Sequence, residues 1–470
     1  MAGNLESRVA RRGMIAEHDE ESISMTFNLN TADDRQAMLE AIGVRSMDDL
    51  LAAIPDALKL TRPLDLPPAM SEMELSRHVQ QLAARNQHAT AQLCFLGGGS
   101  YDHFIPAVVD ALTSRAEFYT SYTPYQPEVS QGNLQAMFEY QTLICQLTGM
   151  DVSNASLYDG GSAAVEAVLL SMGVTRRTGK VVVPSSVHPE YRQILETYLA
   201  ELDTELVVLP TPTGRLDIEA LDGVLDDQVA CLLVQHPNFF GGLEQVDAIA
   251  QRVHAVGGLL VQIFDPISVG LLKRPAELGA DVAVAEGQAL GIPLQFGGPY
   301  LGIMACREKF VRRLPGRIAG QTVDRRGRRC WVLTLQTREQ HIRRDKATSN
   351  ICTNQGLMAL RATIYLSWLG PHGLRDVAEH CVRKCRHAIS QVCKKERYEL
   401  RFSGPTFKEF VVRDRRGDVP AVLAEARRNG CLAGIPLGRW YPELEDCFLV
   451  AVTEKRTVEE IQQLAASLPQ

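Results

Sequence analysis

Residues 180–184 read Lys180-Val181-Val182-Val183-Pro184, an apolar run between a charge and a proline that is typical of a buried β-strand. Similar apolar runs alternate with segments of helical periodicity further along the chain. The pattern predicts strands at 205–209, 229–234, 258–264 and 282–285, and helices at 189–199, 218–225 and within 243–256. Strands that are apolar on both faces and alternate with helices indicate a mostly parallel sheet covered on both sides, so the fold class is α/β.

The length of the chain predicts more than one domain. Its 470 residues suffice for a large α/β domain and a smaller second one. We expect a flexible extension over residues 1–24, an N-terminal arm over 25–68, a large domain over 69–340 and a small C-terminal domain over 341–470. Both Met1 and Met25 are open as the natural start, and we favour Met25.

The arm is predicted from a helix start and a proline-rich connector. Thr31 can cap a helix that extends to Ile42. Residues 61–68, Thr61-Arg62-Pro63-Leu64-Asp65-Leu66-Pro67-Pro68, form an extended segment instead. Arms of this kind commonly wrap a neighbouring subunit.

Charge and composition exclude several classes of partner. A net charge of -7 gives no bulk attraction to nucleic acid or to an anionic membrane. No apolar run is long enough to span a bilayer, and the N-terminus has no apolar signal segment, so we predict a cytoplasmic protein. The 11 cysteines form no CxxC pair, which predicts reduced, mostly buried thiols and no metal site.

Two common nucleotide-binding motifs are absent from the sequence, and its most basic segment is typical of a surface hairpin. Gly97-Gly98-Gly99-Ser100 lacks the lysine and the spacing of a P-loop, and no GxGxxG opens the first βα unit, which disfavours an NAD-binding dehydrogenase. The run Arg325-Arg326-Gly327-Arg328-Arg329 is typical of a solvated hairpin, with an anion-binding surface as the alternative.

Polar residues follow the predicted strands: His188, Asn238, Asp265 and Gln288. Ligands of such sheets bind beyond the carboxyl ends of the strands. In a fold-type I pyridoxal-phosphate enzyme an aspartate pairs with the ring nitrogen, an imidazole stacks on the ring and a glycine-rich helix start holds the phosphate. Asp265, His188 and Gly160-Gly161-Ser162 could fill these roles. Helix caps and a turn are the alternative explanation of the same residues.

The segment after the last predicted strand carries a substitution of chemical interest. It reads Ala285-Glu286-Gly287-Gln288-Ala289-Leu290-Gly291-Ile292-Pro293-Leu294-Gln295-Phe296-Gly297-Gly298-Pro299. A pyridoxal-phosphate enzyme would have its Schiff-base lysine here. Gln288 stands at that place, and a primary amide cannot form an imine with an aldehyde. A chain of this fold would then need a partner to hold the cofactor.

Long motifs indicate a known family. They include Phe95-Leu96-Gly97-Gly98-Gly99-Ser100-Tyr101-Asp102-His103-Phe104-Ile105-Pro106, the segment 122–132 from Tyr122 to Gly132, His188-Pro189-Glu190-Tyr191-Arg192, and the segment 336–354 from Gln336 to Asn354. With these segments the chain resembles subunit 1 of glycine dehydrogenase (decarboxylating), the P-protein of the glycine cleavage system in its two-subunit form. The resemblance extends from about residue 25 to the C-terminus.

The resemblance implies a fold and a division of labour. The fold would be the fold-type I pyridoxal-phosphate-dependent transferase architecture, aspartate aminotransferase-like, with a smaller C-terminal α+β domain. Subunit 2 would bind pyridoxal phosphate, and this chain, inactive alone, would complete the partner's active site in a heterotetramer. The assembled enzyme would decarboxylate glycine and transfer the aminomethyl group to the lipoyl arm of the H-protein.

The resemblance also implies which residues contribute to that site: Tyr101, His103, Tyr122, Thr123, Tyr125, Gln126 and Glu128. Two prolines and two tyrosines within 122–127 give a rigid irregular segment that presents hydroxyl and amide donors. A packed surface loop, in a non-catalytic scaffold subunit, is the alternative. A self-sufficient enzyme with another lysine is a third possibility, but neither Lys273 nor Lys346 follows a predicted strand.

Overall fold

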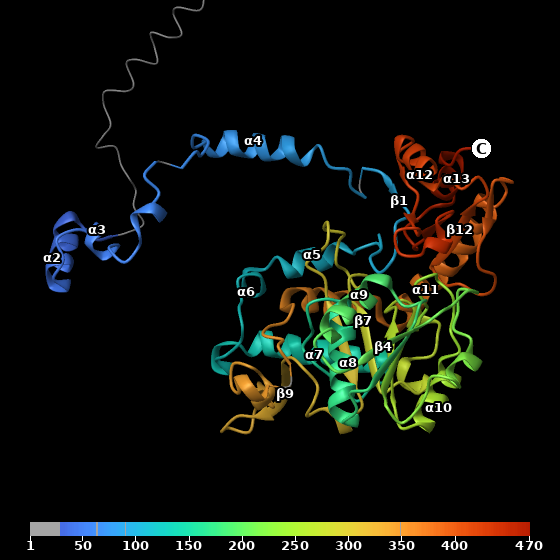
Figure 1. Cartoon of the computed structure of the whole chain (residues 1–470), viewed down its shortest axis with the longest axis horizontal. Helices are drawn as coiled ribbons and strands as arrows, with labels where there is room; N and C mark the ends of the chain where they lie inside the picture. The colour runs from blue at the N-terminus through green and yellow to red at the C-terminus, as the bar shows by residue number, and fades with distance from the viewer. Residues whose placement is uncertain (1–28, 63, 90, 348) are drawn as a thin grey trace, which may run out of the picture. The chain divides into compact units, whose positions relative to one another are not determined.

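The computed structural model describes residues 29–62, 64–89, 91–347 and 349–470, and the chain divides after Arg85 into two units (Figure 1). The predicted extension over residues 1–24 and the favoured start at Met25 lie outside the described residues. The domain boundaries predicted after residues 68 and 340 stay predictions.

The first unit consists of short helices: α2 (Ala32–Ile42), α3 (Met47–Leu50), the 3-10 turn η1 (Asp56–Leu58) and α4 (Glu72–Ala83). The predicted cap is confirmed, because the Thr31 hydroxyl accepts a hydrogen bond from the Asp34 N–H (3.1 Å) and the Asp34 carboxylate accepts one from the Thr31 N–H (2.8 Å). Among the described residues of this unit only Leu39 is buried. Most of its large apolar side chains are therefore exposed.

The second unit is built on a seven-stranded sheet with the order β2-β8-β7-β6-β5-β3-β4. Five of its strands run parallel, and β8 runs antiparallel to both of its neighbours. The strands are β2 (Val152–Ser153), β3 (Lys180–Pro184), β4 (Glu205–Leu209), β5 (Val229–His236), β6 (Leu259–Phe264), β7 (Val282–Glu286) and β8 (Gly302–Cys306). The predicted mostly parallel sheet is confirmed.

Helices cover both faces of this sheet, as the apolar strands require (Figure 1). Val181 and Val183 of β3 pack in one cluster with α8 (Gly160–Thr175) and α9 (Pro189–Leu199). Val182 points to the opposite face and packs in a second cluster with α10 (Val246–Ala255). Successive side chains of a strand alternate between faces, so a continuous valine run is buried only when both faces are covered.

The predicted helix at 218–225 is wrong in extent. Only the 3-10 turn η3 (Ile218–Leu221) forms, with the Asp217 carboxylate accepting from the Glu219 N–H (3.1 Å). Gly223 follows directly, and glycine costs about 1 kcal/mol in a helix. Eight residues are also too few to offset the cost of helix nucleation without more packing.

Further elements lie before and beside the sheet. Helices α5 (Ala107–Thr113), α6 (Ala116–Tyr119) and α7 (Gln131–Thr148) precede it, with the 3-10 turn η2 (Pro127–Val129) between α6 and α7. Strands β9 (Ile318–Val323) and β10 (Arg329–Thr334) pair antiparallel, which confirms the predicted basic hairpin. The remaining 3-10 turns are η4 (Ser268–Gly270), η5 (Pro275–Leu278), η6 (Glu308–Phe310), η7 (Gln336–Arg338) and η8 (Arg344–Lys346).

The C-terminal part begins with the long helix α11 (Gly356–Val392), which is kinked where Gly370 takes a non-helical conformation before Pro371. A four-stranded antiparallel sheet follows, in the order β11-β12-β15-β14. The elements are β11 (Tyr398–Leu400), β12 (Glu409–Asp414), α12 (Val419–Arg428), β13 (Cys431–Leu432), β14 (Ile435–Pro436), η9 (Pro442–Leu444), β15 (Cys447–Ala451) and α13 (Val458–Ser467). β13 pairs parallel with β1 (Leu93–Cys94), far earlier in the chain.

Two general features agree with the composition. Most of the eleven cysteines are buried, as predicted. Within the described part of the chain, every helix is too short or too polar to cross a bilayer.

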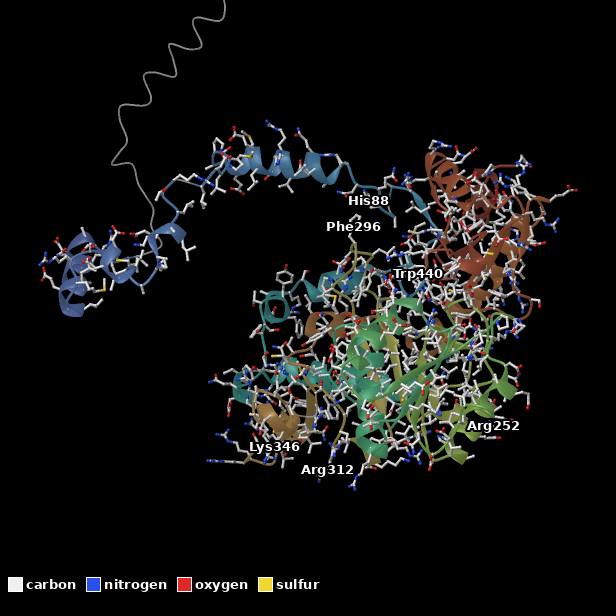
Figure 2. The ribbon with its side chains drawn as sticks, in the orientation of Figure 1. His88, Arg252, Phe296, Arg312, Lys346 and Trp440 are labelled. Atoms are coloured by element: carbon white, nitrogen blue, oxygen red, sulfur yellow. The ribbon has the colours of Figure 1, made fainter. Side chains whose placement is uncertain are left out.

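The loop between β7 and β8 begins near Gln288 and carries Phe296, whose side chain is 80% exposed (Figure 2).

We predict that Gly241→Ala destabilises the second unit strongly. Gly241 has a φ of +82° and accepts a hydrogen bond from the Phe407 N–H (3.1 Å), and an added Cβ would clash with the backbone carbonyl of Glu409. Strain and clash together should lower the free energy of unfolding by at least about 3 kcal/mol. Gly327→Ala is the matched control, because its φ is +73° with open space around it, and it should cost only about 1 kcal/mol. Equal losses in denaturant titrations would contradict the close approach.

Candidate functional site

The carboxyl ends of β5, β6 and β7 lie side by side, and the polar residues that follow them gather there. Asp265 and His188 line one small cavity of about 40 Å³, whereas Asn238 does not line it. The buried Asn238 amide donates to the carbonyl of Gly214 (2.8 Å) and to the Glu244 carboxylate (2.7 Å). Asn238 therefore stabilises a loop.

A lysine that sequence reasoning missed occupies the centre of this site. Nζ of Lys408 lies 2.6 Å from Oδ2 of Asp265, and the side chain is 1% exposed. The same Nζ lies 3.4 Å from the centroid of the Tyr101 ring. Asp265 thus has an ammonium partner within its own chain, and Tyr101 covers that ammonium by a cation–π contact. The one signal in the sequence is a charged pair, Lys408-Glu409, at the start of the apolar run 410–412.

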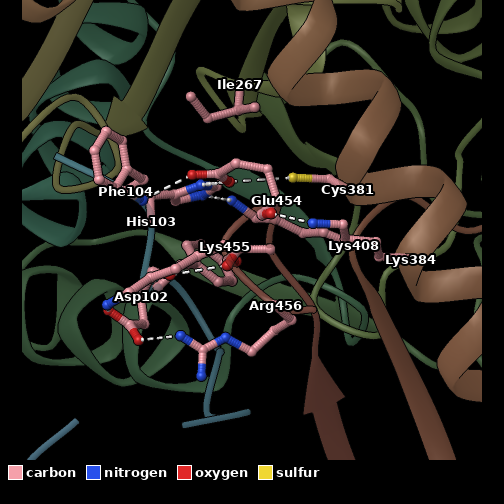
Figure 3. A network of polar contacts seen from close by, with 12 residues as sticks. Asp102, His103, Phe104, Ile267, Cys381, Lys384, Lys408, Glu454, Lys455 and Arg456 are labelled. Atoms are coloured by element: carbon pink, nitrogen blue, oxygen red, sulfur yellow. Dashed lines mark hydrogen bonds and ion pairs between the residues drawn. The ribbon is translucent and has the colours of Figure 1, made fainter. Parts of the chain in front are cut away.

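A second buried layer continues from Lys408 (Figure 3). Nζ of Lys408 donates to Nε2 of His103 (3.2 Å), because an ammonium has no acceptor, and Nδ1 of His103 then donates to Oε2 of Glu454 (2.6 Å). Burial raises the pKa of Glu454, but His103 and a hydrogen bond from the Phe104 N–H outweigh this and lower it to about 2. The ionised Glu454 also accepts from the Cys381 thiol (3.7 Å).

This layer is a weak candidate for a metal centre. His103, Cys381 and Glu454 bring three ligand atoms within 4.8 Å of one another. Structural zinc sites need four ligands, and the neighbouring ammonium of Lys408 disfavours a further cation. The geometry is that of a charge network closed by its own hydrogen bonds.

Glu409 forms the other wall behind Tyr101. Its carboxylate accepts from the Tyr101 hydroxyl (2.9 Å) and from the Gly98 N–H (2.7 Å). Burial is the main cause that raises the pKa of Glu409 to about 7. Burial likewise raises the pKa of the Tyr101 phenol, so Tyr101 is a neutral donor at physiological pH.

The glycine-rich start of α8 holds a carboxylate of the protein itself. The Gly160 N–H donates to Oε2 of Glu286 (2.9 Å), and the N–H groups of Gln288 and Leu301 donate to Oε1 (2.9 and 3.0 Å). Burial raises the pKa of Glu286 to about 7, although these donors oppose the shift. Helix N-termini attract anions, and here an internal acid takes that place.

The other residues that were predicted to hold the phosphate of a cofactor, or to stack on its ring, make local contacts. The Ser162 N–H donates to the Asp159 carboxylate (2.7 Å), and Gly161 lies close to Ile194 of α9. The His188 ring stacks on Tyr191 at 4.6 Å, and its Nε2 lies 2.7 Å from the carbonyl of Gly98. Burial lowers the pKa of His188, so the imidazole is neutral.

Gln288 serves as a clamp between two segments. Its Oε1 accepts from the Tyr101 N–H (2.8 Å), and its Nε2 donates to the carbonyls of Tyr101 (3.0 Å) and Ile292 (2.7 Å). The side chain is buried. A lysine could not replace these contacts, because it has no acceptor for the Tyr101 N–H.

The residues at these strand ends do not fit a pyridoxal phosphate bound to this chain. A cavity of about 40 Å³ has room for a few waters, whereas sites for small organic ligands measure roughly 300 Å³ or more. Glu286 occupies the anion position at α8, and Lys408 satisfies the carboxylate of Asp265. Lys273 and Lys346, the lysines that sequence reasoning weighed, are exposed and do not line this cavity.

The seven residues predicted to contribute to a partner's site fall into two groups. Tyr101 and His103 are buried beside Lys408, with their rings 6.0 Å apart. The other five lie in the segment of residues 119–128, which we call the tyrosine loop. Tyr122 and Thr123 line a separate cavity, the Tyr125 ring lies 6.0 Å from that of His341, and Gln126 and Glu128 are exposed. The catalytic roles of all seven stay predictions.

Comparisons with known proteins agree with this architecture. Two solved structures share the fold. A sphingosine-1-phosphate lyase from Burkholderia pseudomallei matches with a TM-score of 0.63 at 16% identity, covering 88% of this chain and 94% of that one. A glutamate decarboxylase from Lactobacillus brevis matches with a TM-score of 0.65 at 12% identity, covering 88% of this chain and 95% of that one. The chain thus has the fold-type I architecture of pyridoxal-phosphate enzymes.

Comparison of sequences identifies the family more specifically than comparison of folds does. The family described as "Glycine cleavage system P-protein" matches residues 28–468. A "Probable glycine dehydrogenase (decarboxylating) subunit 1" from Carboxydothermus hydrogenoformans is 51% identical over 94% of this chain and 99% of its own length, and one from Thermomicrobium roseum is 51% identical over 94% of this chain and 99% of its own length. The crystal structure of an inhibitor-bound glycine decarboxylase (P-protein) of the glycine cleavage system matches with a TM-score of 0.86 at 42% identity, covering 94% of this chain and 98% of that one. The chain belongs to the P-protein family of the glycine cleavage system.

We predict that Lys408→Met lowers the free energy of unfolding by about 3–5 kcal/mol, because it leaves the carboxylate of Asp265 buried without its ammonium. The double variant Lys408→Met/Asp265→Asn should be more stable than Lys408→Met, since no charge then lacks a partner. Lys180→Met is the control, because it removes a partly exposed ion pair with Asp226 and should cost about 1 kcal/mol or less. Chemical denaturation measures these free energies of unfolding. If the double variant is no more stable than Lys408→Met, the lost ion pair with Asp265 is not the cause of the destabilisation.

Proposed function

We propose that this chain is the subunit of a two-subunit glycine decarboxylase that holds no cofactor of its own and completes the site of subunit 2. The observation that carries the proposal is the strand-end site filled by the chain's own Lys408, Glu286 and Gln288. Gln288 is proposed to stand at the position of the Schiff-base lysine. Pyridoxal phosphate would be bound by subunit 2 and would supply the electron sink for decarboxylation.

The proposed overall reaction uses two further partners. The assembled enzyme would decarboxylate glycine and pass the aminomethyl group to the lipoyl arm of an H-protein. We place the complex in the cytoplasm, as a heterotetramer. Membership of the P-protein family and the names of the relatives support this reading.

The tyrosine loop is the part of this chain proposed to reach the partner's site. Tyr122 is 86% exposed and Tyr125 is 59% exposed, so their hydroxyls are available to another subunit. The loop is anchored by the buried Pro124 and by a hydrogen bond from the Tyr125 N–H to the Thr123 carbonyl (2.9 Å). An anchored loop loses little entropy when its side chains bind a ligand.

The first unit supports association with a partner. Met38 and Ile42 lie one turn apart on α2, and Leu75 and Val79 lie one turn apart on α4, all at least 44% exposed. Apolar side chains at such spacing form a stripe that is stable only when something covers it. We propose that subunit 2 covers both stripes, the one on the arm and the one on α4 beyond it.

We predict that the purified chain alone neither decarboxylates glycine nor gives internal-aldimine absorbance with pyridoxal phosphate, and that both properties appear when subunit 2 is added. Glycine-dependent release of carbon dioxide with lipoylated H-protein and a visible spectrum are the measurements. Activity of the chain alone, or one lysine trapped by borohydride in native protein, would sink the proposal.

Two truncations separate the role of the arm from that of the extension. Deleting residues 1–24 should leave assembly with subunit 2 unchanged, and deleting residues 1–68 should weaken it. Sedimentation of equimolar mixtures measures this directly, and equal behaviour of the two truncations would remove the arm from the interface.

We predict that Tyr122→Phe lowers the turnover of the assembled enzyme by about tenfold or more with assembly intact, because one oriented hydroxyl donor is lost. Tyr125→Phe tests the neighbouring hydroxyl in the same way. Tyr198→Phe is the matched control, since Tyr198 is a 48% exposed tyrosine on α9 outside the loop, and it should keep wild-type turnover. Wild-type turnover in both loop variants would favour the alternative, a non-catalytic scaffold subunit.

A further inference from the structure

A cavity of about 160 Å³ lies between the tyrosine loop, the first turns of α7 and the start of α11. Its polar lining includes Ser121, Tyr122, Thr123, Asn133, Arg317 and Asn354. Arg317 is the only one of the described lining residues that carries a formal charge. The cavity therefore has a single positive group surrounded by hydroxyl and amide groups.

Arg317 is held rigidly and is poorly neutralised. Its side chain donates to Oγ1 of Thr353 (3.1 Å), Oδ1 of Asn354 (2.7 Å) and the carbonyl of Cys352 (3.2 Å), and the residue is 4% exposed. All three acceptors are neutral. Among the described residues no carboxylate lies within ion-pair distance of the guanidinium, and its Nε has no hydrogen-bond partner.

Glu339 interacts with Arg317 through its charge, but no hydrogen bond or ion pair joins the two side chains. Burial raises the pKa of Glu339, and the nearby Arg317 only partly offsets that effect. A buried guanidinium without a paired carboxylate costs free energy that an incoming anion would recover.

The start of α11 adds donors to the same cavity. Gly356 and Leu357 of its first turn line the cavity, and no side chain caps the helix at Gln355. The segment from Gly356 to the kink at Gly370 is long enough to present a positive N-terminal end. An uncapped helix start and a buried arginine thus line the same cavity, together with Tyr122 and Thr123.

We propose that this cavity binds a small oxyanion, a carboxylate or a phosphate, held by Arg317 and the N-terminal turn of α11. The volume suits such an ion and is too small for a larger organic ligand. The source of the ion in the assembled enzyme rests on the proposed function: it is either the carboxylate of glycine or the phosphate of the cofactor bound by subunit 2.

Titration calorimetry on the full-length chain alone tests this, with inorganic phosphate and with acetate in a chloride-poor buffer. We expect saturable binding of one ion per chain to the wild type and at least about tenfold weaker binding to Arg317→Gln. Tighter binding of phosphate points to the cofactor as the source, and tighter binding of acetate points to glycine. Absence of saturable binding of both ions, or equal affinity in Arg317→Gln, overturns the proposal.

A second variant keeps Arg317 and all its hydrogen bonds. Asn133→Asp places a carboxylate of nearly the same shape in the cavity, and an acid in the first turn of α7 does not harm that helix. It should also weaken binding at least about tenfold. Arg312→Gln is the control, because it removes an exposed arginine outside the cavity lining and should bind the ion like the wild type (Figure 2).

The binding test is independent of the activity test. If phosphate or acetate binds as expected but subunit 2 restores no activity, the proposed function fails and the anion site stands. If the complex is active but neither ion binds to the wild type, the anion site fails and the proposed function stands.

Discussion

The buried ammonium of Lys408 has to be balanced inside the protein, and the carboxylate of Asp265 does so where β6 ends and β12 begins. An unpaired charge at this depth would cost several kcal/mol, so the loop after β6 and the start of β12 are fixed relative to each other. Tyr101 and His103 contact the same ammonium and bring the segment around residue 101 to this point. One ion pair thus joins the parallel sheet, the C-terminal sheet and the chain that precedes both.

Two side chains of the protein itself occupy the places where folds of this class hold the charged groups of a ligand. Glu286 satisfies the N-terminus of α8, and Lys408 satisfies Asp265. Asp265 and the start of α8 therefore already have partners of the kind that a cofactor would provide. The cavity beside the tyrosine loop differs, because Arg317 there has neutral acceptors only. The ligand site that we propose for this chain therefore lies beside the loop.

The sequence was informative wherever apolar periodicity was long. The strands at 180–184 and 205–209 and the helix at 189–199 match the structure residue for residue, because the apolar pattern of this region is continuous. The helix at 218–225 failed because local propensity overrode a short pattern. Lys408 escaped prediction because a charged residue beside an apolar strand is normally a solvated flank, and only the long-range pairing with Asp265 buries it. Glu286 escaped for the same reason.

The pairing of β1 with β13 has a consequence for synthesis of the protein. Leu93 and Cys94 lie beside Cys431 and Leu432, so the first strand of the second unit has no partner until nearly the whole chain has been translated. At about 5–20 residues per second the ribosome needs tens of seconds to cover that interval. During this time Phe95, which is fully buried in the mature protein, is exposed on a nascent chain. This early segment therefore has to wait for the C-terminal part of the chain before it can pair, and chaperones that shield it would assist its folding.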